Sequence, residues 1–198
     1  MIAFFGGSFD PVHNGHLILA QDIKENFGFE KIIFIPAYIS PLKKKHYAKP
    51  EHRLEMLKIA IRDIDHFGID TWEIERKCVS YTIDTLNYIW EKYGEKPYLL
   101  LGADSILSFK SWKYPEKIIE KSYIICMERE GKLSKVRDYL KENFPAFKEN
   151  KDYFLVNTRR IDISSTEIRE RVRRGKPIRG MVPYEIEIFI KENKLYSQ

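Results

Sequence analysis

Residues 2–16 read IAFFGGSFDPVHNGH, and this stretch decides the fold. Its first residues form an apolar, β-rich run, after which Leu19, Ile23 and Phe27 recur at helical spacing and Gly28 is placed to end a helix. The pattern predicts a buried strand, a glycine-rich loop and a helix N-terminus. In an open parallel sheet this junction favours anions, because backbone N–H groups can approach a phosphate and the helix start carries partial positive charge.

The same alternation of strand and helix continues along the chain. Further apolar runs with the character of buried strands are Lys31 to Pro36, Tyr98 to Leu101, Tyr123 to Met127 and Tyr153 to Val156. Helical spacing between them links Leu54, Leu57, Ile61 and Ile64, then Ile83, Leu86 and Trp90, then Val136, Leu140 and Phe144. We therefore predict an α/β fold with a Rossmann-like, doubly wound, mainly parallel sheet.

Three segments stand outside this alternation. Gly68 to Glu75 alternates apolar and polar residues and predicts a half-exposed edge strand, whereas Glu128 to Lys151 is charged and predicts a surface excursion. Ser164 to Leu195 reads as two helices separated near Gly175 to Pro183. We expect a single domain over residues 1–198, with an α/β core in 1–160 and a helical C-terminal subregion in 161–198.

Composition excludes several classes of protein. The 198 residues are 43% hydrophobic and 14% aromatic, which is enough for a sizeable core and argues against disorder. No apolar run nears the roughly 18 residues of a membrane span, no secretory signal is visible, and Cys78 and Cys126 lie too far apart for a CxxC motif. We expect a cytoplasmic protein. The net charge of +5 suits an anionic partner, either nucleic acid or a phosphorylated metabolite.

The histidines of the opening motif are candidate phosphate ligands. If the helix starts near His13, then His13 and His16 can face one ligand across a single turn and donate hydrogen bonds to phosphoryl oxygens. Gly15 between them leaves room for a phosphate. A zinc site would need a third ligand, and the remaining histidines show no compact spacing with this pair. We therefore predict no protein-bound metal.

A second candidate phosphate site lies near the other end of the chain, where residues 163–169 read ISSTEIR. Ser164 or Ser165 can be the N-cap of the following helix. Unpaired backbone N–H groups, three hydroxyl groups and the Arg169 guanidinium then gather at one positive helix end.

Taken together, GGSFDPVHNGH and ISSTEIR resemble the two signatures of the HxGH nucleotidyltransferases, and among these the bacterial nicotinate-mononucleotide adenylyltransferases. The resemblance continues through SYTIDTL at 80–86, LGAD at 101–104, the segment around Trp112 and GMVPYEIEIFIKENKLY at 180–196, so it covers nearly the whole chain. It implies transfer of AMP from ATP to nicotinate mononucleotide in NAD biosynthesis. The products would be nicotinate adenine dinucleotide and pyrophosphate.

The resemblance also implies roles for individual residues. His13, His16 and Arg169 would be catalytic. The ATP-binding residues would be Gly7, Ser8, Phe9, His13, His16, Gly102, Asp104, Ser164, Ser165, Thr166 and Arg169. The residues that bind nicotinate mononucleotide would be Ser8, Phe9, Lys43, Thr82, Ala103, Asp104 and Trp112. Mg²⁺ is expected on the ATP phosphates. Leu42, where relatives often carry histidine, and Lys113, where they often carry an aromatic residue, depart from the family pattern and leave the acceptor contacts open.

Other functions compete with this interpretation. Another HxGH transferase would use nicotinamide mononucleotide or phosphopantetheine as its acceptor. A class I aminoacyl-tRNA synthetase would need an anticodon-binding region and a KMSKS-like loop, and neither is present. A nucleic-acid-binding module would use the arginines from Arg169 to Arg179, but Glu167 and Glu170 interrupt that stripe. We expect ATP and nicotinate mononucleotide as partners, with no nucleic acid and no membrane; a homo-oligomer is compatible with the sequence.

Overall fold

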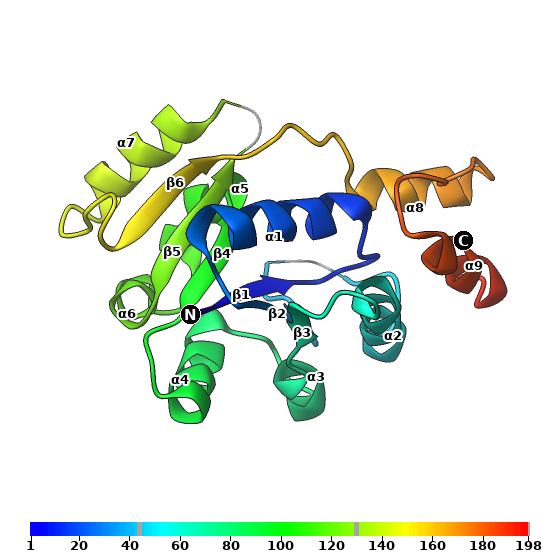
Figure 1. The fold of residues 1–198 in the computed structure, drawn as a ribbon, viewed down its shortest axis with the longest axis horizontal. Coiled ribbons are helices and arrows are strands. Elements are labelled where there is room, and N and C mark those ends of the chain that lie inside the picture. Colours follow the sequence, from blue (N-terminus) through cyan, green and yellow to red (C-terminus); the bar gives the residue numbers. More distant parts are fainter. Residues whose placement is uncertain (43–44, 129–130, 198) are drawn as a thin grey trace.

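A six-stranded parallel sheet forms the centre of the computed structural model, which describes residues 1–42, 45–128 and 131–197 (Figure 1). Its strands are β1 (Ile2–Gly7), β2 (Lys31–Pro36), β3 (Phe67–Ile69), β4 (Tyr98–Gly102), β5 (Tyr123–Glu128) and β6 (Tyr153–Asn157). They lie in the order β3-β2-β1-β4-β5-β6, and every neighbouring pair is parallel. The predicted doubly wound α/β fold and its five parallel strands are confirmed, although β6 is an edge strand in which only Tyr153 is buried.

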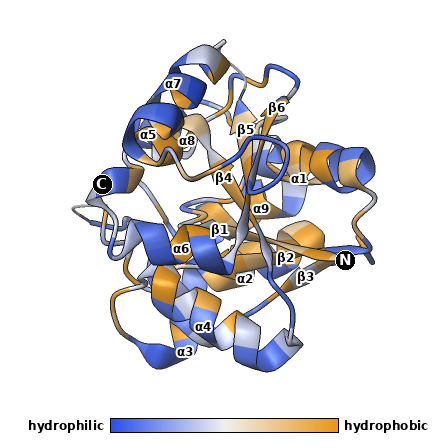
Figure 2. Ribbon diagram, turned by 90° about the vertical axis from the view of Figure 1, so that its left-hand side faces the viewer, coloured by the Kyte–Doolittle hydropathy of each residue, from blue (hydrophilic) through white to orange (hydrophobic). Residues whose placement is uncertain are grey.

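Helices cover both faces of the sheet because alternate strand residues point to opposite sides. Ala3 and Phe5 of β1 join one apolar cluster with α1 (Asn14–Phe27) and α2 (Pro50–Ile61), whereas Phe4 faces α4 (Thr82–Tyr93). The second face continues under α5 (Ala103–Leu107), α6 (Pro115–Lys121) and α7 (Leu133–Asn143). Figure 2 shows the apolar strands enclosed by helices whose colours alternate between hydrophobic and hydrophilic.

The strand order reverses direction at β1. The chain winds outward through α1 to β2 and then to β3, and afterwards crosses back to β4 on the other side of β1. Ligands bind such sheets outside the carboxyl ends of the strands at this switch point. The segment 8–13 and the start of α1 leave β1 at that edge, so the topology brings the glycine-rich motif to the expected ligand side.

The C-terminal region forms the two predicted helices, α8 (Ser165–Arg173) and α9 (Tyr184–Glu192), which lie together at one end of the molecule (Figure 1). Their apolar residues pack into the same cluster as α1 and α2. Asn14 adds a polar connection, since its N–H donates to the Met181 carbonyl over 2.9 Å and its side-chain amide to the Gly180 carbonyl over 2.8 Å. The C-terminal region is therefore anchored at the first residue of α1.

The predicted edge strand over 68–75 is wrong in its length. Strand β3 ends at Ile69, and the chain then forms a short helix, α3 (Trp72–Arg76). Asp70 turns the chain, because its carboxylate accepts the N–H of Trp72 over 3.0 Å. The Trp72 ring then stacks on Tyr88 of α4 with 4.5 Å between ring centroids. This contact with α4 favours the helix over the strand that the alternation of apolar and polar residues predicts.

Two smaller expectations also change. On α4 the prediction placed Trp90 on the buried face with Ile83 and Leu86. In the structure the neighbouring residue Ile89 is buried there, and Trp90 is 47% exposed. The charged segment 128–151 contains α7, whose residues Val136 and Leu140 are buried against the sheet, so it belongs to the core layer. In the described ranges no helix has both the length and the apolarity to cross a bilayer.

Candidate active site

A cavity of about 360 Å³ lies at the carboxyl ends of β1, β4 and β5. Its walls include the start of α1, the start of α5 and the residues just before and at the start of α8. The two signature segments therefore meet in one place although most of the chain separates them. Of the predicted site residues, the cavity wall contains His13, Gly102, Asp104, His16, Ala103, Ser164 and Ser165.

The two histidines are held in a defined geometry at the start of α1. His13 is the N-cap and only 5% exposed, and its ring stacks on that of His16 with 3.7 Å between centroids. The His13 N–H donates to His16 Nδ1 over 3.2 Å. A ring nitrogen that accepts a hydrogen bond carries no proton, so a neutral His16 carries its proton on Nε2. His16 is thus prepared to donate from Nε2.

Aromatic contacts fix the His16 ring further. Phe5 and Phe9 meet it edge-on, with centroids 6.0 Å and 5.2 Å away. Gly7 permits this arrangement, because a Cβ there would lie 2.9 Å from the Phe9 ring. The predicted nucleotide contacts Ser8 and Phe9 are both buried and do not line the cavity.

Gly15 lets the His13 ring lie close to α1. A Cβ at this position would lie 3.0 Å from His13 Nδ1 and 3.1 Å from Cε1 of the same ring, so a larger side chain would crowd the imidazole. Gly15 also lines the cavity, and the room that it leaves for a phosphate stays a prediction.

The start of α8 forms the opposite wall. Ser164 is the N-cap, and its hydroxyl oxygen accepts the Glu167 N–H over 3.1 Å. Ser165 donates its hydroxyl to the Pro11 carbonyl over 2.9 Å and so ties α8 to the segment before α1. Both serines line the cavity. Two helix N-termini, those of α1 and α8, therefore contribute positive potential to the same space.

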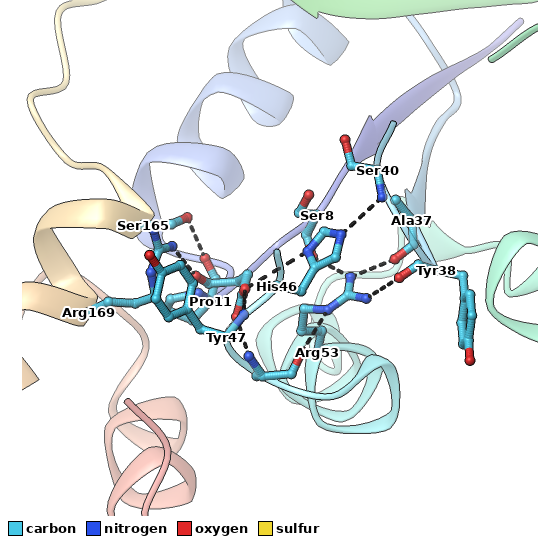
Figure 3. A network of polar contacts seen from close by, with 12 residues as sticks. Ser8, Pro11, Ala37, Tyr38, Ser40, His46, Tyr47, Arg53, Ser165 and Arg169 are labelled. Carbon is cyan, nitrogen blue, oxygen red and sulfur yellow. Dashed lines mark hydrogen bonds and ion pairs between the residues drawn. The ribbon is translucent and has the colours of Figure 1, made fainter. Parts of the chain in front are cut away.

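Arg169 lies one helical turn further along α8, outside the cavity wall. One of its Nη atoms donates to the Asp10 carbonyl over 2.7 Å and the other to the Thr166 hydroxyl over 3.1 Å. The guanidinium carbon is 4.2 Å from the centre of the Tyr47 ring (Figure 3). Its Nε is buried and has no hydrogen-bond partner among the described residues. Each Nη carries a second N–H, so Arg169 keeps donor capacity while its position is fixed.

The third wall is the junction of β4 and α5. Gly102 ends β4 and is the N-cap of α5, where a Cβ would meet nothing within 4 Å. Asp104 extends from the first turn of α5, and its carboxylate lies 3.1 Å from the ammonium of Lys132. Both Asp104 and Lys132 belong to the cavity wall, so a charged pair links α5 to the N-cap residue of α7 there.

Two of the predicted acceptor residues, Thr82 and Trp112, lie outside the cavity wall. Thr82 is the first residue of α4, and Trp112 packs its ring 5.0 Å from Phe109 while its Nε1–H donates to the Ser108 hydroxyl over 3.4 Å. Neither Thr82 nor Trp112 contributes to the cavity wall. Lys43 lies outside the described residues.

Sequence reasoning missed a buried arginine that organises the neighbouring loops. Arg53 of α2 is fully buried and donates to the carbonyls of Ala48, Ser8, Ala37 and Tyr38 over 2.6 to 3.3 Å (Figure 3). Burial lowers the pKa of Arg53 because it disfavours the charged form, and the nearby Asp10 carboxylate opposes this effect. Its position four residues before Leu57, on the buried face of α2, was a signal that sequence analysis could have used.

The acidic side chains at the cavity are few. Asp104 pairs with Lys132, and Glu128 is buried at the end of β5. Among residues 1–42, 45–128 and 131–197 no three His, Cys, Asp or Glu side chains gather in a way that could hold a metal ion.

The chain was compared with known proteins. The cytidylyltransferase-like family model matches residues 4–171. An Aquifex aeolicus protein that carries the name probable nicotinate-nucleotide adenylyltransferase is 54% identical over 82% of this chain and 98% of its own length. A Hydrogenobaculum protein of the same name is 39% identical over 100% of this chain and 98% of its own.

The solved structure of Plasmodium falciparum nicotinic acid mononucleotide adenylyltransferase complexed with NaAD superposes with a TM-score of 0.78, covering 98% of this chain and 96% of that one. At 22% identity this likeness supports the fold alone. The sequence matches go further, because they extend over nearly the whole chain at identities well above that level. The chain therefore belongs to the nicotinate-nucleotide adenylyltransferases of the cytidylyltransferase-like family.

Proposed function

We propose that this chain transfers the adenylyl group of ATP to nicotinate mononucleotide and releases pyrophosphate, with His16 as the principal catalytic residue. Membership of the family supports the reaction. The observation that carries the assignment of residues is the single cavity in which the starts of α1 and α8 meet, with His16 held by the His13 N–H. ATP phosphates fit this space because two helix N-termini favour negative charge there.

In the proposed reaction an oxygen of the acceptor 5′-phosphate attacks the α-phosphorus of ATP. One P–O bond forms to the acceptor while the bond to pyrophosphate breaks, so no covalent intermediate with the protein is needed. Negative charge grows on the α-phosphoryl oxygens and on the departing pyrophosphate. The contribution of the protein is then alignment and electrostatic stabilisation.

His16 is suited to this task because Nε2 carries the proton in the neutral ring. Its orientation is fixed by His13 and two aromatic rings before substrate arrives, so little reorganisation is needed as charge develops. We assign His16 to the α-phosphoryl oxygens and His13 to the neighbouring phosphate. Ser164, Ser165, Thr166 and Arg169 would hold the triphosphate, and Mg²⁺ bound to ATP would neutralise part of its charge.

For the acceptor we propose the surface around Thr82, Ala103 and Trp112, with Lys43 near the mononucleotide phosphate. Ala103 connects this surface to the ATP cavity, because it lies in the cavity wall. A nicotinate carboxylate accepts hydrogen bonds on both oxygens, whereas nicotinamide replaces one acceptor by a donor. Backbone N–H groups near Ala103 and Asp104 would therefore favour the acid.

The direct test measures pyrophosphate release with ATP and, in parallel, nicotinate mononucleotide, nicotinamide mononucleotide and phosphopantetheine. We expect the highest specificity constant with nicotinate mononucleotide, at least about tenfold above nicotinamide mononucleotide. Turnover of phosphopantetheine alone would identify a different HxGH transferase. Equal use of the acid and the amide would contradict the proposed carboxylate contacts while leaving the adenylyl transfer intact.

A further inference from the structure

We infer that Tyr196, which follows α9, is a positioning residue for adenylyl transfer and acts on Arg169 through Asp10. The inference rests on the proposed function in one respect, the assignment of Arg169 to the ATP phosphates. It adds a residue far from the reacting atoms whose hydroxyl holds the ATP side of the site in place. The evidence is a chain of hydrogen bonds that begins at the Tyr196 hydroxyl.

The Asp10 carboxylate is the centre of this chain of contacts. Asp10 is 2% exposed, and its Oδ2 accepts the Tyr47 N–H over 2.7 Å. Its Oδ1 accepts the Ala48 N–H over 3.1 Å and the Tyr196 hydroxyl over 2.7 Å. Three donors from two distant segments thus satisfy one buried carboxylate, and the Tyr196 hydroxyl is the donor that comes from the C-terminal region.

The direction of the Tyr196 hydrogen bond is fixed. The ring is 9% exposed, and burial together with the Asp10 charge raises the pKa of Tyr196. The hydroxyl therefore stays protonated and donates to the carboxylate. The positive charges of Arg53 and Arg169 oppose this rise in pKa.

Two contacts lead from Asp10 to Arg169. The Asp10 carbonyl accepts an Nη–H of Arg169 over 2.7 Å. The Tyr47 ring lies 4.2 Å from the guanidinium carbon, and the backbone of Tyr47 is held by the Asp10 carboxylate. Figure 3 shows Tyr47, from the loop before α2, beside Arg169. Loss of the Tyr196 hydroxyl should therefore disturb both contacts of Arg169, the one with the Asp10 carbonyl and the one with the Tyr47 ring.

The structure offers a conservative variant. Tyr196→Phe keeps a ring in the apolar cluster and removes only the hydroxyl, so Oδ1 of Asp10 retains a single donor. The matched control is Tyr184→Phe on α9, a residue that is 58% exposed and whose ring lies 5.4 Å from the guanidinium carbon of Arg179. Neither residue lines the ATP cavity.

The experiment measures the dissociation constant of ATP by calorimetry without acceptor, together with the thermal midpoint of unfolding. We expect Tyr196→Phe to weaken ATP about tenfold, as befits loss of a hydrogen bond to a charged group, and Tyr184→Phe to leave it unchanged. A merely structural role would lower the thermal midpoint without this selective loss. Because the readout is ATP binding, an error in the proposed acceptor would not affect the result.

Further variants test whether Tyr196 acts on ATP binding through Arg169. In an Arg169→Ala background, Tyr196→Phe should cause no further loss of ATP affinity, because the group that it positions is gone. Tyr47→Ala should weaken ATP and Tyr47→Phe should restore affinity, since the ring supports the guanidinium. Tyr47 is 57% exposed, so these two variants do not depend on a buried side chain for folding. Unchanged ATP affinity in Tyr196→Phe, or an equal loss in both backgrounds, would overturn the inference.

Discussion

We expect Gly15→Ala to lower turnover while leaving the thermal midpoint of unfolding nearly unchanged. Gly15 is the second residue of α1, where alanine in place of glycine stabilises a helix by about 1 kcal/mol. The added Cβ would lie 3.0 Å from His13 Nδ1, which is closer than ordinary van der Waals contact at about 3.5 Å or more. The His13 ring must therefore move by a few tenths of an ångström. Its neighbour in the stack, His16, would be displaced with it.

The size of the effect follows from this displacement. A misplacement of about 1 Å at a reacting centre costs about 10²-fold in rate, so a shift of roughly half that size should lower turnover about tenfold, or about 1.4 kcal/mol in the barrier. The gain in helix propensity offsets the crowding, and the thermal midpoint should change by no more than about 4 °C.

The assay combines steady-state pyrophosphate release with thermal unfolding for a double-mutant cycle. In a His13→Ala background the clash is absent, so Gly15→Ala should no longer lower turnover and should stabilise the protein by about 1 kcal/mol. A tenfold loss of turnover that persists in that background would refute the reasoning. So would Gly15→Ala with wild-type turnover, because the contact with His13 would then have no catalytic consequence.

The remaining predictions concern ATP, the acceptor and stability. Arg169→Ala should raise the KM for ATP at least about tenfold and leave the acceptor KM nearly unchanged, and the reverse outcome would show that the two phosphate sites are misassigned. Trp112→Ala should weaken both mononucleotides together without changing their ratio, as compared by specificity constants; selective loss of the acid would mean that Trp112 does more than stack. Burial raises the pKa of Glu73, so the folded state holds its proton more tightly and wild-type stability falls as pH rises above about 4.5. Glu73→Gln has no carboxyl proton to lose. Its free energy of urea unfolding should therefore increase relative to that of wild type as the pH rises above about 4.5. A difference in unfolding free energy that does not change with pH would contradict this.

The fold was predictable because its signals are local. Parallel strands read as continuous apolar runs, and the glycine-rich loop after β1 was predicted as a junction that favours anions. The meeting of His16 and Ser164 in one cavity was implied only by the family resemblance, which gave both residues to ATP. Helix phase on α4 was predicted less well, because Trp90 counted as apolar although it is partly exposed.

The hydrogen-bond partners that support the site could not be predicted from the sequence, and the reason is physical. Asp10 and Tyr196 are separated by 186 positions, and nothing local indicates that a tyrosine hydroxyl finds a buried carboxylate at that distance. The position of Arg53 on the buried face of α2 was visible in the sequence, but its carbonyl partners come from segments that only the folded chain brings together. Polar groups buried in this way are specified by tertiary partners, whereas strands and caps are specified by neighbouring residues.

The most direct test of the central claim compares His16→Ala with wild type for single-turnover formation of nicotinate adenine dinucleotide and for ATP affinity. Donation from Nε2 to the α-phosphoryl oxygens acts mainly in the transition state, so the rate should fall by about 10²-fold or more. The dissociation constant of ATP should change by less than about threefold, because this interaction adds little in the ground state. A near-normal rate, or a loss of ATP affinity that accounts for the whole effect, would contradict the role assigned to His16.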